Sequence, residues 1–385
     1  MFTYKIDRRK FVTVATIALL AACKAVPGGK PAPPPPPPDQ PTADVLPADV
    51  GRHRVALLVP LSGANSAAGQ SIANATTMAL LDTNAQNLRI TSYDTTAGAG
   101  AAAARAIAEG NGLILGPLMS EDIPAVAAAA RAAKVPVISY SNDEQRAARD
   151  VLIMGNLPSQ SVARTVAYAR AQGASRYAAL VPVGEYGQRS SAALIASVRE
   201  QGGTVAVMES YDRTATSLTA AARRLRTKGG YDAVLIADGG RMSVQAAPIL
   251  KAGPGGTARI LGSELWSGES VVTATPALAG AWYSAVSDSR WRQFTDSYRN
   301  RFGNPPYRIA TLGYDSVLLT LRIARDWKPR TPFPTARLFD RDGFLGLDGV
   351  FRFRANGAIQ RALEVRQVRA GGVDVVSAAP AKFEN

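Results

Sequence analysis

The run Val55-Ala56-Leu57-Leu58-Val59-Pro60-Leu61-Ser62-Gly63 decides the fold. Its first five residues are apolar without a break, which is typical of a strand buried on both faces of a parallel sheet. Pro60 ends the strand because it has no backbone N–H to donate to a neighbouring strand. A helix is predicted over 66–81, so this stretch begins a strand–helix–strand unit.

The same alternation of strands and helices continues to residue 261. It predicts strands over 88–93, 112–115, 135–139, 177–181, 204–209, 233–237 and 259–261. It predicts helices over 99–109, 120–133, 159–172, 187–201, 216–228 and 242–250. The order favours an α/β fold with two doubly wound parallel-sheet lobes.

The remaining third of the chain has a different pattern. A strand is predicted over 281–286, and helices are predicted over 288–302 and 307–326. Residues 346–376 alternate apolar and polar side chains with a period of two, and Asn356-Gly357 predicts a hairpin turn among them.

The chain is basic, with 385 residues and a formal charge of +14. Nucleic acid is a poor match, because basic residues such as Arg223 and Arg226 are scattered through predicted helices without interleaved aromatics. The positive charge fits several alternatives: an anionic cell-wall polymer, a phospholipid surface, an acidic partner or a basic face that is simply solvated. With a single cysteine the chain cannot form an internal disulfide.

That cysteine, Cys23, ends the run Leu20-Ala21-Ala22-Cys23 behind a basic segment and an apolar stretch too short to span a membrane. The arrangement resembles a bacterial lipoprotein signal, which implies removal of residues 1–22 and lipidation of Cys23. Arg8-Arg9 also resembles a twin-arginine export motif, and general secretion remains the alternative. An aspartate directly after the lipidated cysteine would favour retention at the inner membrane. This chain has Lys24 at that position, so it resembles lipoproteins directed to the outer membrane.

Residues 23–51 are rich in Pro, Ala and Gly, with unbroken proline over 33–38. Proline fixes φ, so this segment is predicted to be an extended tether of up to ~85 Å.

Candidate ligand contacts follow the strands, because open α/β sheets bind ligands beyond the carboxyl ends of their strands. Ser62, Ser120 and Ser141 follow the first, third and fourth predicted strands. They could hold an anion together with backbone amides at helix starts. The alternative is that all three are N-caps, worth about 1 kcal/mol each.

Several motifs occur in an order that resembles the leucine/isoleucine/valine-binding type of periplasmic binding protein, over nearly all of 54–376. They are Pro60-Leu61-Ser62-Gly63, Tyr93-Asp94-Thr95, Leu115-Gly116-Pro117-Leu118-Met119-Ser120, Val135-Pro136-Val137-Ile138-Ser139, Glu185-Tyr186-Gly187, Gly313-Tyr314-Asp315-Ser316 and Gly346-Leu347-Asp348-Gly349-Val350-Phe351-Arg352-Phe353.

This resemblance implies two lobes joined by three crossings (periplasmic binding protein type I), with 52–156 and 287–328 in the first lobe and 157–286 and 329–385 in the second. It implies that Ser120 contacts an amino-acid carboxylate, that Glu264 holds its ammonium group, and that Tyr186 lines the cleft. We add Asn142, Asp238 and Trp266 to the predicted ligand contacts because they follow strand ends or adjoin Glu264.

The chain also departs from that pattern. Ala67-Ala68 stands where an aromatic is usual, and Asn142-Asp143 replaces small or threonine residues. A buried Asp143 would repel a ligand carboxylate unless Arg241 or a ligand amine compensates its charge.

The lipobox, tether and fold together resemble penicillin-binding protein activators, although the helical-repeat domain of the best-known members is missing. This implies a non-enzymatic, lipid-anchored periplasmic protein that modulates peptidoglycan synthesis, with a penicillin-binding protein as partner. The alternative is a solute receptor that delivers an amino acid to the permease of an ABC importer.

No catalytic residue, metal site or cofactor is predicted. The single histidine, His53, is expected to be a solvated junction residue, which leaves no Ser-His-Asp triad. Gly98-Ala99-Gly100 follows the second strand but lacks the final glycine of a dinucleotide fingerprint.

Overall fold

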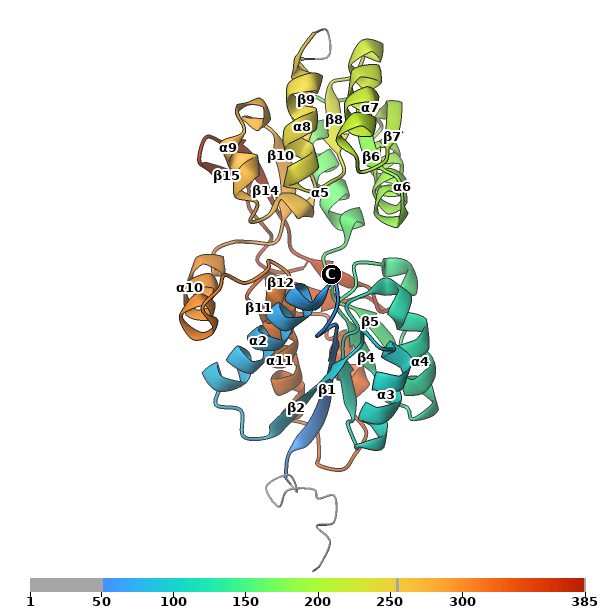
Figure 1. Ribbon diagram of the computed structural model, residues 1–385, viewed down its shortest axis with the longest axis vertical. Coiled ribbons are helices and arrows are strands. Elements are labelled where there is room, and N and C mark those ends of the chain that lie inside the picture. The colour runs from blue at the N-terminus through green and yellow to red at the C-terminus, as the bar shows by residue number, and fades with distance from the viewer. Residues whose placement is uncertain (1–50, 254–255, 384–385) are drawn as a thin grey trace, which may run out of the picture. The chain divides into compact units, whose positions relative to one another are not determined.

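The computed structural model describes residues 51–253 and 256–383, shown in Figure 1. The predicted signal peptide, Cys23 and nearly all of the tether lie outside the described residues.

The first lobe is built on a five-stranded parallel sheet in the order β2-β1-β3-β4-β5. Its apolar strands are buried on both faces. Helices α2 and α11 pack together on one face, and α3 and α4 pack together on the other (Figure 1). The strands are β1 (His53–Val59), β2 (Leu88–Asp94), β3 (Leu113–Leu115), β4 (Val137–Ser139) and β5 (Val151–Ile153). The helices are α2 (Ser66–Asp82), α3 (Ala99–Ala108), α4 (Ile123–Ala132), α10 (Trp291–Phe302) and α11 (Ala310–Ala324).

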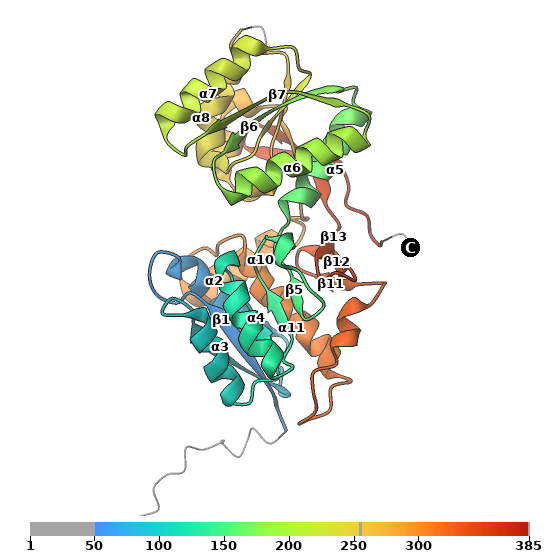
Figure 2. The same ribbon diagram turned by 90° about the vertical axis from the view of Figure 1, so that its right-hand side faces the viewer.

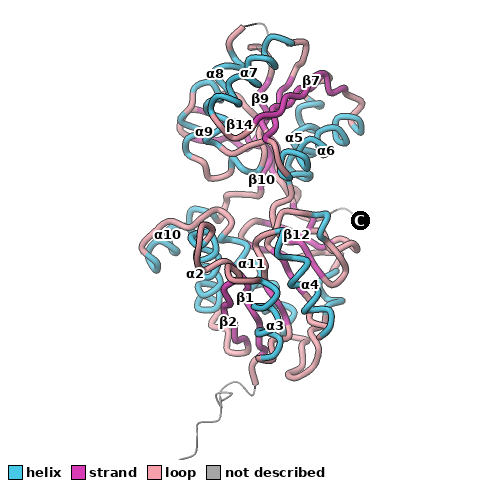
Figure 3. The backbone as a smooth tube through the Cα atoms, turned by 45° about the vertical axis from the view of Figure 1, so that its right-hand side comes forward, coloured by secondary structure: helices cyan, strands magenta, loops and turns pink. Residues whose placement is uncertain are grey.

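The second lobe is built on a seven-stranded mixed sheet in the order β15-β14-β10-β9-β8-β6-β7, in which β14 and β15 are antiparallel to their neighbours. Helices lie on both sides of the strands (Figures 2 and 3). The strands are β6 (Arg176–Pro182), β7 (Thr204–Tyr211), β8 (Ala233–Ile236), β9 (Arg259–Leu261), β10 (Trp282–Ala285), β14 (Glu364–Arg369) and β15 (Gly372–Ser377). The helices are α5 (Pro158–Ala171), α6 (Glu185–Glu200), α7 (Ala215–Lys228), α8 (Gly240–Lys251) and α9 (Ser270–Ala274).

The chain passes between the two sheets three times, through the segments 154–157, 286–290 and 362–363. This confirms the predicted fold class. Before the third crossing, β11 (Phe344–Gly346), β12 (Gly349–Phe353) and β13 (Ile359–Arg361) form a separate antiparallel sheet.

The small sheet packs in the first lobe. The predicted division at 328/329 is wrong here, because it assigned these residues to the second lobe. Phe333, Phe344, Phe351 and Ile359 share one hydrophobic core with the strands of the first lobe. Only β14 and β15 of the predicted tail join the second sheet. A period of two indicates a hairpin but does not tell which lobe the hairpin covers.

Two further local predictions differ from the structure. His53 is the first residue of β1 and is buried, with its ring stacked on Trp327 at a centroid distance of 4.1 Å. It is not a solvated residue, because the indole covers it. Strand β5 was not predicted, since its three residues are too few to show a period.

A matching pair of glycines brings a helix close to the carboxyl end of the first strand in each lobe. A Cβ atom on Gly69 would lie 1.8 Å from the carbonyl oxygen of Pro60, and one on Gly187 would lie 1.7 Å from that of Pro182. Both strands thus lead directly into a tightly packed helix, whose first turn borders the face between the lobes.

Candidate functional site

Helix α6 of the second lobe carries, in its first two turns, side chains that contact the first lobe. Arg189 Nη1 lies 3.2 Å from Asp143 Oδ2, and its Nη2 donates to Asn142 Oδ1 at 3.3 Å. Ser120 Oγ donates to Glu185 Oε2 at 3.4 Å. The predicted contacts Ser120 and Asn142 therefore lie at the boundary between the lobes.

Tyr186 and Glu264, which the resemblance assigned separately to the cleft, contact each other in the second lobe. The Tyr186 hydroxyl donates to Glu264 Oε1 at 2.9 Å and lies 2.9 Å from Ser263 Oγ. Glu264 Oε2 is buried and has no hydrogen-bond partner in the described part of the chain. Burial raises the pKa of the Glu264 carboxyl group to about 7. Burial, reinforced by this acid, also raises the pKa of Tyr186.

A narrow cavity beside Glu264 is lined by several polar side chains whose hydrogen bonding is incomplete. Asn156, Arg308 and Arg361 line it together with Glu264. In the described residues, Asn156 Oδ1, Arg308 Nε and both Nε and Nη1 of Arg361 are buried without a partner. The free volume is about 10 Å³, close to the minimum that holds one water. A larger ligand therefore enters only if the lobes move apart.

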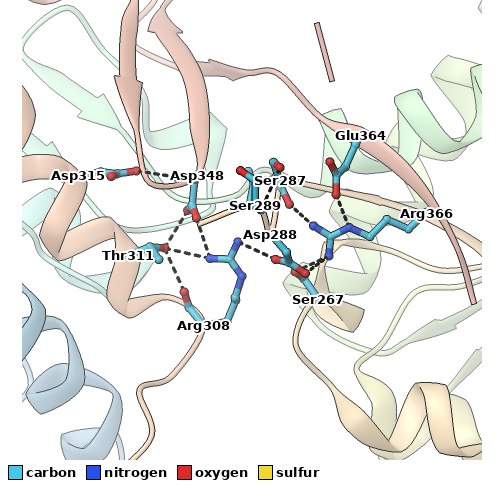
Figure 4. Close-up of polar contacts among 11 residues, drawn as sticks. Ser267, Ser287, Asp288, Ser289, Arg308, Thr311, Asp315, Asp348, Glu364 and Arg366 are labelled. Atoms are coloured by element: carbon cyan, nitrogen blue, oxygen red, sulfur yellow. Dashed lines mark hydrogen bonds and ion pairs between the residues drawn. The ribbon is translucent and has the colours of Figure 1, made fainter. Parts of the chain in front are cut away.

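A chain of ion pairs runs along the crossings beside this cavity (Figure 4). Asp288, on the second crossing, pairs with Arg366 of β14 at 2.5 Å and with Arg308 of the first lobe at 3.4 Å. Arg308 Nη1 also lies 2.8 Å from Asp348 Oδ1, and Arg366 Nε lies 2.7 Å from Glu364 Oε1. The second crossing is thus tied to both lobes and to β14, the strand that follows the third crossing.

The other two predicted serines, Ser62 and Ser141, form hydrogen bonds with neighbouring loop residues of the first lobe. Ser62 Oγ donates to Asp94 Oδ2 at 2.7 Å. Together with the Leu61 amide it holds the pKa of the Asp94 carboxyl group well below its usual range. Ser141 is buried, and its Oγ accepts from the Asp143 amide at 3.1 Å. Both hydroxyls therefore already have partners within their own lobe.

Asp238 and Trp266 lie within the second lobe. Asp238 Oδ2 accepts from the Tyr211 hydroxyl at 2.7 Å and from Arg213 Nε at 3.0 Å. The Trp266 side chain is 1% exposed, and its indole Nε1 donates to the Asp238 carbonyl at 3.0 Å. Trp266 is a core residue here and does not line an open cleft.

The charge of Asp143 is compensated by arginines of the protein, but not by Arg241, the residue that the sequence suggested. Arg189 pairs with it at 3.2 Å and Arg146 at 3.5 Å, whereas Arg241 is exposed. The sequence analysis missed Arg189, although Glu185 and Arg189 lie one helical turn apart at the start of α6. Arg308 and Arg361 carry no such local signal, because only tertiary packing buries them.

The described residues contain no helix long and apolar enough to cross a membrane. They also contain no cluster of three or more His, Cys, Asp or Glu side chains placed to hold a metal ion.

Comparisons with known proteins agree with this architecture. The model of the periplasmic binding protein family matches residues 53–373. No curated protein sequence matches the chain significantly.

Several solved structures of similar fold are described as proteins of ABC transporters. A putative branched-chain amino acid ABC transporter protein from Rhodospirillum rubrum has a TM-score of 0.74 at 20% identity, covering 84% of this chain and 100% of its own. A leucine-binding protein from Thermotoga maritima has a TM-score of 0.66 at 21% identity, covering 85% and 98%. A solute-binding protein from Rhodopseudomonas palustris, solved with 3,4-dihydroxybenzoic acid, has a TM-score of 0.69 at 17% identity, covering 87% and 98%. At these identities the likeness shows the fold.

Proposed function

Because this chain belongs to the periplasmic binding protein family, we propose that it is the solute receptor of an ABC importer and binds a small amino-acid-like zwitterion between its lobes. One observation carries the proposal. Glu264 and Arg361 line the same cavity, and each has buried side-chain atoms without a hydrogen-bond partner among the described residues.

Buried polar atoms without partners cost free energy that a ligand can recover. An ammonium group suits the Glu264 carboxylate, and a carboxylate suits the guanidinium groups of Arg361 and Arg308. A zwitterion would satisfy both ends of the cavity at once. Ser120 and Tyr186, on opposite lobes, would then close over the ligand from either side.

Lobe movement is part of this function. Because the cavity holds no more than a water, the ligand must enter an open form and shift the population toward a closed one. The ligand can do so only by contacting the two lobes together. Arg308 and Arg361 in the first lobe and Glu264 in the second supply such contacts.

The partner that fits these neighbours is the permease of the importer. The first interpretation of the sequence, an activator of a penicillin-binding protein, finds no support in the comparisons. We keep the proposal that the protein is lipid-anchored through Cys23, facing the periplasm, and that it catalyses no reaction.

A thermal-shift screen tests the proposal. The panel holds the common amino acids, with benzoate and alkylamines as ligands that carry only one charge. A zwitterion at ~100 times its dissociation constant should add ~2.7 kcal/mol, a shift of several degrees. Glu264→Gln should abolish the shift, whereas Glu200→Gln, on the exposed end of α6, should leave it intact.

Two outcomes count against the proposal. No shift with any amino acid would exclude the zwitterion, and a shift with benzoate alone would favour an anionic solute. A shift that survives Glu264→Gln would place the ligand elsewhere.

A further inference from the structure

We propose that a basic groove on the small sheet of the first lobe binds an extended acidic segment of a partner protein. The groove has a volume of about 750 Å³. Four of its lining residues are arginines, and the others are neutral, as follows: Arg149, Arg341, Arg352, Arg354, Thr335, Ala336, Phe339, Phe353, Ala355 and Gln360. It is separate from the cavity beside Glu264.

Three of the four arginines in this groove have no ion-pair partner among the described residues. Arg149, Arg341 and Arg354 are exposed and take part in none of the ion pairs among the described residues. Two other exposed arginines of the same lobe do have acidic partners. Arg131 pairs with Asp150 at 2.5 Å, and Arg337 pairs with Asp326 at 3.0 Å.

Arg352 fixes the shape of the groove. Its Nε donates to Gln360 Oε1 at 2.9 Å, and its Nη1 donates to the Arg341 carbonyl at 3.0 Å. Its guanidinium group also lies 4.6 Å from the ring centre of Phe383. These contacts hold the wall of the groove in place, and the three exposed arginines lie in the turns and loops around it.

A second groove of about 480 Å³ continues the first, since both are lined by Arg354 and Gln360. It adds Arg164, and no acidic residue lines it. It also borders the cavity beside Glu264, since both are lined by the buried Arg361. Arg164 belongs to α5 of the second lobe, so the basic surface passes across the crossings. Phe383, the last described residue, also lines this second groove.

The lining selects a peptide over other polyanions. Phe339, Phe353, Ala336 and Ala355 are apolar neighbours of the arginines. A peptide can present acidic and apolar side chains together, whereas a polyphosphate offers only anionic oxygens. A flat bilayer surface cannot follow the walls of a groove. Arginine forks also bind carboxylates in a bidentate manner, which gives an acidic peptide a defined register.

Fluorescence anisotropy with a short labelled peptide in which Glu alternates with Leu tests the proposal on the purified protein. Removing the three exposed arginines together, by Arg149→Gln, Arg341→Gln and Arg354→Gln, should weaken binding about tenfold. Arg199→Gln, Arg223→Gln and Arg292→Gln together remove the same charge from exposed positions that line neither groove. This control should bind as the wild type does.

Competition experiments identify the source of the negative charge. Inorganic polyphosphate and phosphatidylglycerol vesicles are compared with the peptide, and a matched Gln/Leu peptide tests the need for acid groups. The proposal is overturned if the Gln/Leu peptide binds equally well, if the control triple variant weakens binding as much, or if polyphosphate or vesicles bind more tightly through the same arginines. The ligand-induced thermal shift should persist in the groove variant, which separates this test from that of the cleft.

Discussion

Asp288 and Arg366 form an ion pair at 2.5 Å that joins the second crossing to the strand following the third. The Arg366 side chain is 1% exposed, so its charge depends on Asp288 and Glu364 for compensation. The second oxygen of Asp288 lies 3.4 Å from Arg308 of the first lobe. The Asp288 carboxylate thus pairs with one guanidinium group from each lobe and links the two lobes at the second crossing.

Asp288→Asn should lower the free energy of unfolding by about 1–3 kcal/mol, because it leaves a buried arginine with one fewer anion. The matched control is Asp374→Asn, which breaks a pair with Arg369 that is 2.7 Å long and has both side chains more than half exposed. That loss should be about 0.5 kcal/mol or less. Urea denaturation measures both, and equal losses would mean that the crossing network adds nothing beyond a surface ion pair.

Gly187→Ala should destabilise the second lobe by about 2–4 kcal/mol, because the new methyl group meets the Pro182 carbonyl, which is backbone and cannot turn aside. Gly239→Ala is the control, since nothing lies within 4 Å of its Cβ position and its φ is −68°. Thermal unfolding distinguishes them. A neutral Gly187→Ala variant would show that α6 can shift away from the strand.

The fold could be predicted largely because a parallel strand buried on both faces leaves an uninterrupted apolar run such as 55–59. Tyr186 and Glu264 were each assigned to the cleft by the resemblance alone, and their hydrogen bond to each other was not predicted. Arg361 and Arg366 could not be found, since alternation in a strand indicates two faces but not which face tertiary packing covers. Trp266 was misplaced for the same reason: its burial depends on contacts with α8 and β10 that are distant in sequence.

Cys23→Ser should release the protein from the membrane fraction, if residues 1–23 act as the lipoprotein signal that they resemble. Labelling of cells with a radioactive fatty acid should mark the wild type and leave the variant unmarked. Lys24→Asp is a matched change beside the same cysteine. It should keep the label and move the protein to the inner membrane. A variant without Cys23 that still incorporates fatty acid would contradict the assignment.

The pKa of Glu264 makes both stability and ligand binding depend on pH. Burial raises it to about 7 from an ordinary 4.5, so the folded protein holds a proton that the unfolded chain releases between these values. The contribution of Glu264 to stability is therefore greatest below pH 4.5 and falls by about 3 kcal/mol as pH rises to 7. Burial and Asp348 also raise the pKa of Asp315, which acts in the same direction.

The difference between the wild type and Glu264→Gln isolates this carboxyl group, because Asp315 is common to both. Urea denaturation at a series of pH values should show the Gln variant gaining stability relative to the wild type from pH 5 to pH 8. A ligand ammonium group binds the ionised carboxylate, so its affinity for the wild type should rise about tenfold between pH 6 and pH 8. Over the same pH interval the folding stability of the wild type falls while its affinity for the ligand rises. Titration of Glu264 explains both changes only if its carboxylate contacts the ligand. An affinity independent of pH, with the stability change intact, would leave Glu264 a buried structural acid.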